Sequence, residues 1–141
     1  MRRAFVLAFL LLFACRESED PVVRTIEAIA EAAEDRDVED VMQYVSTTYE
    51  GNRGEIEASL RRYFFAYQSF DLSISNLENH RSGDESWATF RVKMIGVPKT
   101  VGGMDQYLPR AADYRFEVSL REEGDAWRVT SARWEELRGL N

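Results

Sequence analysis

The spacing of apolar positions divides the chain into a helical first half and a second half with a period of two. Asp20 followed by Pro21 predicts a helix start, because aspartate caps a helix and proline suits its first turn. Asp37 predicts the start of a second helix, and Asn52 with Glu55 has the spacing of a capping box that opens a third. The apolar positions of these helices are Val22, Val23, Ile26, Ile29, Ala30, Ala33, Val38, Val41, Met42, Val45, Ile56, Leu60, Tyr63, Phe64 and Tyr67. The pattern therefore predicts three helices.

From residue 70 onward, apolar residues alternate with polar ones, which is typical of half-buried strands. The polar segment 81–85 predicts the turn of one hairpin, and segment 123–125 predicts the turn of another. The alternating apolar positions are Phe70, Leu72, Ile74, Ala88, Phe90, Val92, Met94, Ala112, Tyr114, Phe116, Val118, Leu120, Trp127 and Val129. A phase slip between Val129 and Trp134 indicates a β-bulge. Helices followed by consecutive antiparallel hairpins predict an α+β domain.

The N-terminal segment has the layout of a secretory signal. Arg2 and Arg3 precede the uncharged run 4–14, and Ala14 is the small residue that a signal peptidase requires before the cut. At about 1.5 Å per helical residue, this run covers roughly half of a ~30 Å hydrocarbon core. It is therefore too short to span a membrane.

The end of this run, Leu12-Phe13-Ala14-Cys15, resembles the lipobox of bacterial lipoproteins, although Phe13 is larger than the residue usual at its position. In that family the cysteine thiol carries a diacylglyceryl group and the chain is cut before it, so the resemblance implies lipidation at Cys15. The alternative is an ordinary signal peptide with an incidental cysteine. Cys15 is the only cysteine, so an exported chain forms no internal disulfide, and a thioether at Cys15 prevents unwanted pairing.

These observations predict a signal peptide at 1–14, a lipidated cysteine with a short tether at 15–20, and a domain at 21–141. In enteric lipoproteins an aspartate directly after the cysteine favours the inner membrane, and this chain has Arg16 there. The resemblance therefore implies a lipid-anchored protein of the bacterial cell envelope. It favours the outer membrane, facing the periplasm, over the inner membrane.

Charge and composition exclude several classes of function. Without its first 14 residues the 141-residue chain loses two arginines, and 16 basic side chains then oppose 25 acidic ones for a net charge of −9. An acidic surface repels phosphates, so no nucleic acid partner is expected. With His80 the only histidine and Cys15 assigned to the anchor, one chain cannot assemble a His/Cys metal or haem site, and no cofactor is expected.

Two segments and the order of predicted elements resemble the nuclear transport factor 2-like (NTF2-like) superfamily, which includes ketosteroid isomerase and the SnoaL-like cyclases. EAIAEAAEDRDVEDVMQYVSTTY, residues 27–49, is similar to the usual opening, and GDAWRV, residues 124–129, is similar to the last hairpin of many members. The resemblance implies three N-terminal helices packed on a strongly bent antiparallel sheet of about four strands. This cone-shaped fold leaves a cavity at its wide end.

In that superfamily the cavity binds small molecules, catalyses proton transfers or is filled by side chains. A catalytic version needs a carboxylate with a raised pKa opposite hydroxyl donors. Asp40 and Tyr44 are candidates because positions i and i+4 share a helix face, but Asp40 also suits the first turn of its helix. The candidates for lining a ligand site are Tyr44, Tyr63, Tyr67, Tyr107 and Tyr114, with Tyr49 as a further inward-pointing residue. Tyrosines on apolar stripes equally serve as packing residues.

Two other features have alternative interpretations. His80 adjoins a polar turn, so a solvated loop histidine is favoured over a proton shuttle. The segment Gly96–Arg110 contains five glycines and prolines and is long for a connection. Its apolar residues suit a flap over the cavity mouth or a dimer contact, or else a loop folded back on the sheet.

The sequence thus predicts a membrane-anchored envelope lipoprotein whose non-enzymatic NTF2-like domain binds a small apolar ligand or an envelope protein. The alternative is a small enzyme of the isomerase or cyclase type that uses a cavity carboxylate and tyrosines. A third class is an assembly domain that forms a homodimer through its sheet face, for which an exposed apolar sheet face is expected.

Overall fold

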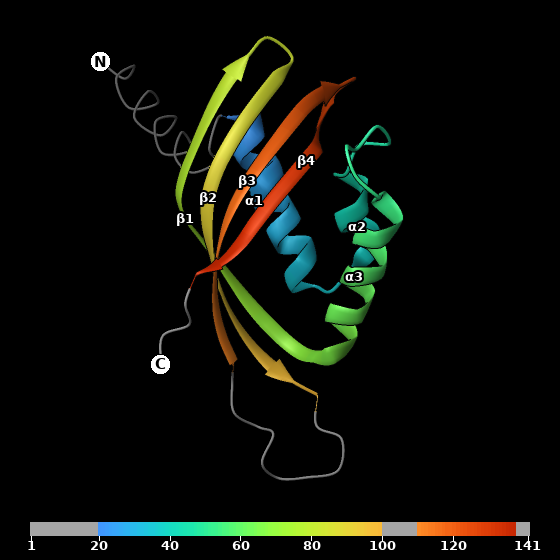
Figure 1. Ribbon diagram of the computed structural model, residues 1–141, viewed down its shortest axis with the longest axis vertical. Coiled ribbons are helices and arrows are strands. Elements are labelled where there is room, and N and C mark those ends of the chain that lie inside the picture. The colour runs from blue at the N-terminus through green and yellow to red at the C-terminus, as the bar shows by residue number, and fades with distance from the viewer. Residues whose placement is uncertain (1–19, 100–109, 138–141) are drawn as a thin grey trace, which may run out of the picture.

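The computed structural model describes residues 20–99 and 110–137, which form three helices followed by four strands (Figure 1). The elements are α1 (Pro21–Glu34), α2 (Val38–Gln43), α3 (Arg53–Ala66), β1 (Tyr67–Ser82), β2 (Glu85–Pro98), β3 (Arg110–Glu123) and β4 (Ala126–Leu137). The strands form one antiparallel sheet in the order β1-β2-β3-β4. This arrangement confirms the predicted α+β class.

Each helix begins at the polar residue that the sequence indicates. The Asp20 carboxylate accepts a hydrogen bond from the backbone N–H of Val22 at 2.9 Å, and Asp37 and Asn52 accept in the same way from residues 40 and 55. These bonds satisfy N–H groups that the first turn of a helix leaves without partners. Helix α2 is shorter than predicted, so Val45 lies beyond its end.

The sheet is a meander with tight turns. Gly83 and Gly124 have φ values of 63° and 64°, which glycine adopts without steric cost, and each begins the turn of a hairpin. The predicted bulge in the last strand is confirmed, because the partner of Ser119 is Ser131 and the partner of Leu120 is Val129. Thr130 is the extra residue of β4 that this register leaves unpaired.

The sheet curves around α1, and all three helices lie on its concave face (Figure 1). The main core joins α1 to the strands through Val22, Ile26, Ala88, Phe90, Val92, Val118, Leu120, Trp127 and Val129. A second cluster joins α1, α2 and α3 to the sheet through Ala32, Val41, Phe64, Phe70 and Met94. Trp127 is 4% exposed and Trp134 is 58% exposed, so the first of these two tryptophans belongs to the core and the second does not.

A segment after α2 runs along the outer edge of β4 and joins it through backbone hydrogen bonds. The Val129 N–H donates to the Tyr44 carbonyl at 2.7 Å, and the Val129 carbonyl accepts from the Ser46 N–H at 2.9 Å. The Glu50 N–H donates to the Thr130 carbonyl at 2.8 Å. Segment 44–50 therefore covers only the first part of the β4 edge.

Two predictions about connections are wrong. His80 lies within β1 rather than in a loop, and its exposed ring stacks on Trp87 with centroids 5.6 Å apart. The connection expected at Gly96–Arg110 is shorter at both ends, because β2 continues to Pro98 and β3 already begins at Arg110. The ladders of β2 with β1 and with β3 include Gly96, which pairs with Phe70 on one side and with Arg110 on the other.

The convex face of the sheet is dense in charged side chains. Cross-strand partners on it include Arg115 with Glu135 and Glu117 with Arg133, and Arg91 pairs with Asp113 at 2.6 Å. The exposed large apolar residues of this face, among those described, are Trp87 and Ile95. The described part of the chain therefore presents no continuous apolar patch on this face.

Candidate functional site

An aromatic row crosses three strands on the concave face. Phe90 of β2 is paired in register with Phe116 of β3, which in turn is paired with Trp134 of β4. The Phe90 and Phe116 rings are 5.4 Å apart and nearly parallel, and the Phe116 and Trp134 rings are 6.2 Å apart. Exposure rises along the row from 8% at Phe90 to 58% at Trp134. The row therefore leads from the core to solvent.

A cluster of tyrosines lies beside this row, where α3 ends and β1 begins. The Tyr63 and Tyr67 rings are 4.9 Å apart, and Phe70 packs edge-on against both. Tyr114 extends the cluster from β3 and lies 6.3 Å from Phe116. The structure thus brings together three of the predicted ligand-lining residues, one from each of three elements.

The hydroxyl of Tyr63 lies close to the Met94 sulfur and to the hydroxyls of Tyr67 and Tyr114. It donates to the Met94 sulfur at 2.7 Å, and a thioether sulfur is a poor acceptor compared with oxygen. Burial raises the pKa of Tyr63 well above its usual value of 10.0, and the neighbouring phenols of Tyr114 and Tyr67 raise it further. Tyr63 therefore keeps its proton at any physiological pH and remains a hydrogen-bond donor.

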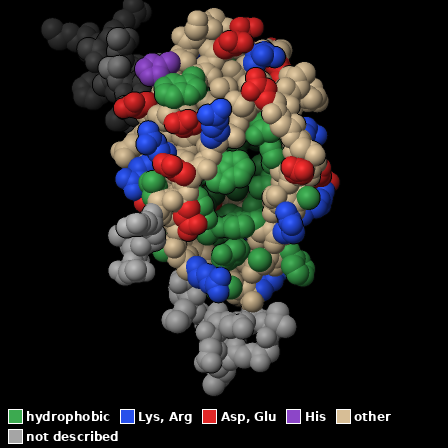
Figure 2. Space-filling model, in the orientation of Figure 1, with side chains coloured by type: hydrophobic (Ala, Val, Ile, Leu, Met, Phe, Trp, Pro, Cys, Tyr) green, Lys and Arg blue, Asp and Glu red, His purple; other side chains and the backbone are tan. Residues whose placement is uncertain are grey.

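The aromatic row and the tyrosine cluster open toward the space between the sheet and the helices. Figure 2 shows hydrophobic side chains gathered in a hollow on this side of the molecule, with Lys, Arg, Asp and Glu around its rim. A hollow with an apolar floor and a few hydroxyl groups is typical of small-molecule sites.

The structure separates the other candidates from this cluster. Asp40 is exposed in the first turn of α2, where its backbone N–H donates to the Asp37 carboxylate at 3.0 Å. Tyr44 ends the same helix, and its carbonyl accepts from β4. Tyr49 packs against the main core. Asp40 and Tyr44 are therefore not part of the tyrosine cluster.

Several predictions concern residues outside the described part of the chain. These are the signal peptide at 1–14, lipidation at Cys15, the greater part of the proposed flap and the ligand-lining role of Tyr107. They remain predictions.

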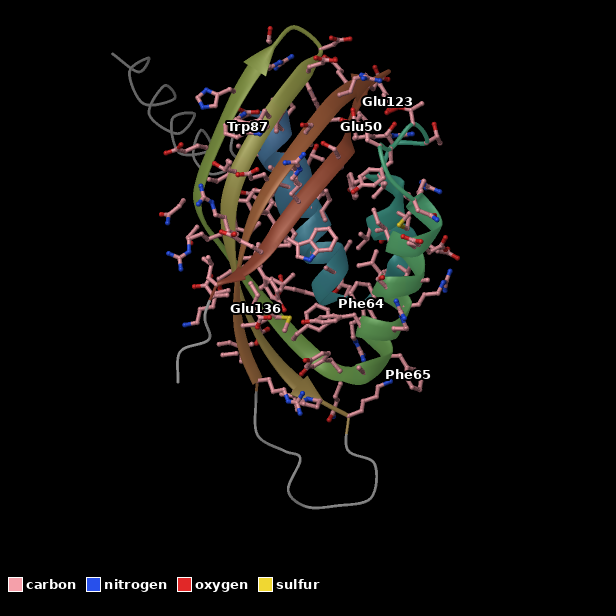
Figure 3. The ribbon with its side chains drawn as sticks, viewed as in Figure 1. Glu50, Phe64, Phe65, Trp87, Glu123 and Glu136 are labelled. Atoms are coloured by element: carbon pink, nitrogen blue, oxygen red, sulfur yellow. The ribbon has the colours of Figure 1, made fainter. Side chains whose placement is uncertain are left out.

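Two residues of the concave face were not predicted from the sequence as part of the candidate site. Glu136 is exposed and paired in register with Tyr114, so a carboxylate and a phenol share this face of the sheet (Figure 3). Trp134 was identified only as an apolar strand position, not as the end of an aromatic row. The signal that locates both is the register across the bulge at Thr130, which the sequence indicates only approximately.

A second concavity of about 410 Å³ lies where the turn after α1, the start of α2 and the C-terminal half of α3 come together with Lys99. It is wide open, and Phe65 at its edge points away from the sheet while Phe64 points toward it (Figure 3). The Lys99 ammonium lies 4.5 Å from the Phe65 ring centre. Asp35 and three cations line this concavity together, so its charge is mixed.

The described residues hold no group of three or more His, Cys, Asp or Glu side chains arranged to bind a metal ion. Among residues 20–99 and 110–137, no helix is both long and apolar enough to cross a membrane.

No protein-family model matches this chain, and no curated protein sequence matches it. Solved structures of the same fold are similar to it. A candidate dehydratase of the NTF2-like family from Streptomyces avermitilis has 14% identity and a TM-score of 0.72, over 84% of this chain and 96% of that one. A candidate scytalone dehydratase from Novosphingobium aromaticivorans has 8% identity and a TM-score of 0.74, over 84% and 83% of the two chains.

An NTF2-like superfamily protein from Salmonella enterica has 10% identity and a TM-score of 0.69, over 85% of this chain and 91% of that one. Identities this low establish the fold alone. The chain has an NTF2-like fold, as the sequence resemblance implied.

Proposed function

We propose that this NTF2-like domain binds a small, planar and largely apolar molecule in the hollow of its concave face, and that lipid on Cys15 holds the domain at a membrane of the cell envelope. The observation that carries the proposal is the exposed Trp134 at the end of a stacked aromatic row, beside a cluster of phenol groups. A solvent-exposed tryptophan on a concave apolar surface gains most when a flat ligand covers it.

The tyrosine hydroxyls indicate which polar group the proposed ligand carries. Because the Tyr63 hydroxyl donates to a sulfur, which is a poorer acceptor than oxygen, an oxygen acceptor on the ligand offers it a stronger hydrogen bond. The ligand we propose therefore carries one carbonyl or hydroxyl oxygen on an otherwise apolar ring system.

A second candidate function is a small enzyme of the isomerase or cyclase type. Glu136 opposite Tyr114 favours it, as do the dehydratase names of two similar structures. However, a carboxylate that exchanges protons near neutral pH needs an environment that removes water, and both Glu136 and Asp40 are exposed. We therefore place binding first.

The test of ligand binding uses anilinonaphthalene sulfonate, a flat aromatic probe whose fluorescence rises in apolar sites. Trp134→Ala and Tyr114→Phe should each weaken probe binding, the first by about tenfold because it removes a large contact surface. Trp87→Ala is the matched control, since Trp87 is an exposed tryptophan on the opposite face of the sheet. Equal binding by the Trp134 and Trp87 variants would refute a site in the hollow.

A ligand that co-purifies with the protein distinguishes a binding domain from an enzyme. Recovery of that molecule unchanged by mass spectrometry supports a binding domain. Conversion that Glu136→Gln abolishes would support the enzyme instead.

A further inference from the structure

The outer edge of β4 is only partly covered by the described residues. Val129 directs its N–H outward to the Tyr44 carbonyl, and its own carbonyl accepts from the Ser46 N–H. In an antiparallel ladder, peptide groups alternate between the two sides of a strand. Since Leu120 faces Val129, the register beyond the bulge directs outward the peptide groups of Ala132, Trp134 and Glu136.

Within residues 20–99 and 110–137, these outward groups form a free edge, meaning one that no other segment pairs with. Segment 44–50 reaches no further than Thr130, and β4 ends at Leu137. Among the described residues, no backbone bond joins the edge at 131–137 to another segment. A run of unpaired N–H and carbonyl groups of this kind is a template for another strand.

Trp134 is the midpoint of the free edge at residues 131–137. If two copies pair antiparallel with Trp134 opposite the partner's Trp134, residues 131–137 overlap along their whole length. A register shifted far in either direction brings the partner's strand against segment 44–50 or beyond the end of β4. Such a self-paired edge has a two-fold axis, the commonest symmetry of homodimers.

Charges on the convex face fit this register. Arg133 lies opposite the partner's Glu135, and the symmetric pair forms at the same time. Within each chain, Arg133 is already paired in register with Glu117, and Glu135 with Arg115. The contact therefore extends alternating charges in a row: Glu117, Arg133, the partner's Glu135 and the partner's Arg115.

We propose that two copies of this chain join antiparallel through β4, centred on Trp134, to form one continuous sheet. This contact goes beyond ligand binding and differs from a dimer through the sheet face, which here is rich in charge. A two-fold axis normal to the sheet leaves both helix layers on the same side (Figure 1). This symmetry allows both chains to attach to one membrane through the lipid that we propose on Cys15.

The test exploits the reciprocal charges. Each dimer contains the contact between positions 133 and 135 twice. In the Arg133→Glu homodimer both contacts bring two glutamates together, and in the Glu135→Arg homodimer both bring two arginines together. Both homodimers are therefore weakened. A mixture of the two variants restores two opposite-charge pairs in the heterodimer, while each monomer is the same molecule as before.

The measurement is the mass of the full chain in detergent, by sedimentation velocity. We expect the parent to be dimeric, each variant alone to associate about tenfold more weakly or worse, and their equimolar mixture to recover the dimer. A monomeric parent would overturn the proposal, as would a mixture that stays monomeric or single variants that dimerise like the parent. Arg133 and Glu135 point away from the hollow, so these outcomes are independent of ligand binding.

Cysteine pairing checks the register. Directly opposed residues in a non-hydrogen-bonded antiparallel pair have Cα atoms about 4.5 Å apart, within disulfide range. Mixed Arg133→Cys and Glu135→Cys chains should therefore cross-link on oxidation far more than either chain alone. The parent controls for Cys15, and Lys93→Cys on β2 controls for random collision. Cross-linking no greater than that of Lys93→Cys would contradict the register.

Discussion

The ring of Tyr67 occupies the space that a side chain on Gly96 would need. A Cβ atom on Gly96 would lie 2.8 Å from two atoms of the Tyr67 ring, closer than packed carbon atoms approach. Gly96 lies opposite Phe70 in the ladder between β1 and β2, so the absence of a side chain there lets Tyr67 join the tyrosine cluster.

Gly96→Ala should therefore destabilise the domain by about 1–3 kcal/mol, because the ring or the strand must move. It should also weaken binding of the fluorescent probe, since Tyr67 is displaced. The measurement is thermal unfolding together with probe titration. In a Tyr67→Ala background the same glycine change should cost little, and an equal cost in both backgrounds would show that the ring is not the obstacle.

The two tryptophans of β4 should differ sharply in their contribution to stability. Trp127→Ala removes a buried ring from the main core and should cost about 3–5 kcal/mol. Trp134→Ala removes a ring that is mostly in water and should cost less than about 1.5 kcal/mol. Chemical denaturation compares them. Similar losses for the two variants would contradict the register of β4.

Because of Asp20, the free energy of unfolding should depend on pH in the acidic range. Burial raises the pKa of its carboxyl, but hydrogen bonds from Asn79 and from the N–H groups of Val22 and Val23, with the charge of Arg81, lower it by more. The net pKa lies below the usual 3.8. The carboxylate therefore stabilises the fold fully above about pH 4, and this contribution is lost as the pH falls through the lowered pKa.

Asp20→Ala should cost about 1 kcal/mol at pH 7, as expected for loss of a helix cap. The difference from the parent should shrink below pH 4, as the parent becomes protonated. Unfolding measured from pH 7 to pH 2 checks this. Asp20→Asn, which retains an oxygen acceptor but no charge, should show a smaller loss without the acid dependence.

Lipid attachment predicts that Cys15→Ser releases the protein from membranes into the soluble fraction. Two or three acyl chains hold a protein firmly, because each buried methylene contributes about 0.8 kcal/mol. Fractionation of cells followed by mass spectrometry of the mature N-terminus measures both location and modification. Unchanged sedimentation of the serine variant with membranes would argue against a lipid on this residue.

The sequence was sufficient for features that depend on neighbouring residues. Asp20, Asp37 and Asn52 cap helices as predicted, because a cap acts over only a few positions. The bulge in β4 was predicted because it interrupts a local alternation. In contrast, the irregularity in β1 near Asn76, with φ of 52°, was not predicted, since polar residues there conceal the change of phase.

The candidate site was predicted only in part for the same reason. Tyr63 and Tyr67 follow from the apolar stripe predicted for the third helix, although Tyr67 is the first residue of β1, and their approach to Tyr114 depends on how distant strands are paired. Glu136 and the exposed end of the aromatic row depend on the register of β4. A pattern with a period of two gives the face of a residue but not its neighbour on the next strand.

The parallel bridge between Val45 and Val129 has a consequence for how the chain folds. It joins a segment made early in synthesis to the last strand, so the loop that it closes includes most of the domain. The main core also needs Trp127 and Val129. An incomplete chain thus lacks both the edge bonds and part of the core, and contacts this distant in sequence slow folding. For the exported lipoprotein that we propose, this delay is an advantage, because the N-terminal half cannot form a finished domain until the C-terminal strand has crossed the membrane.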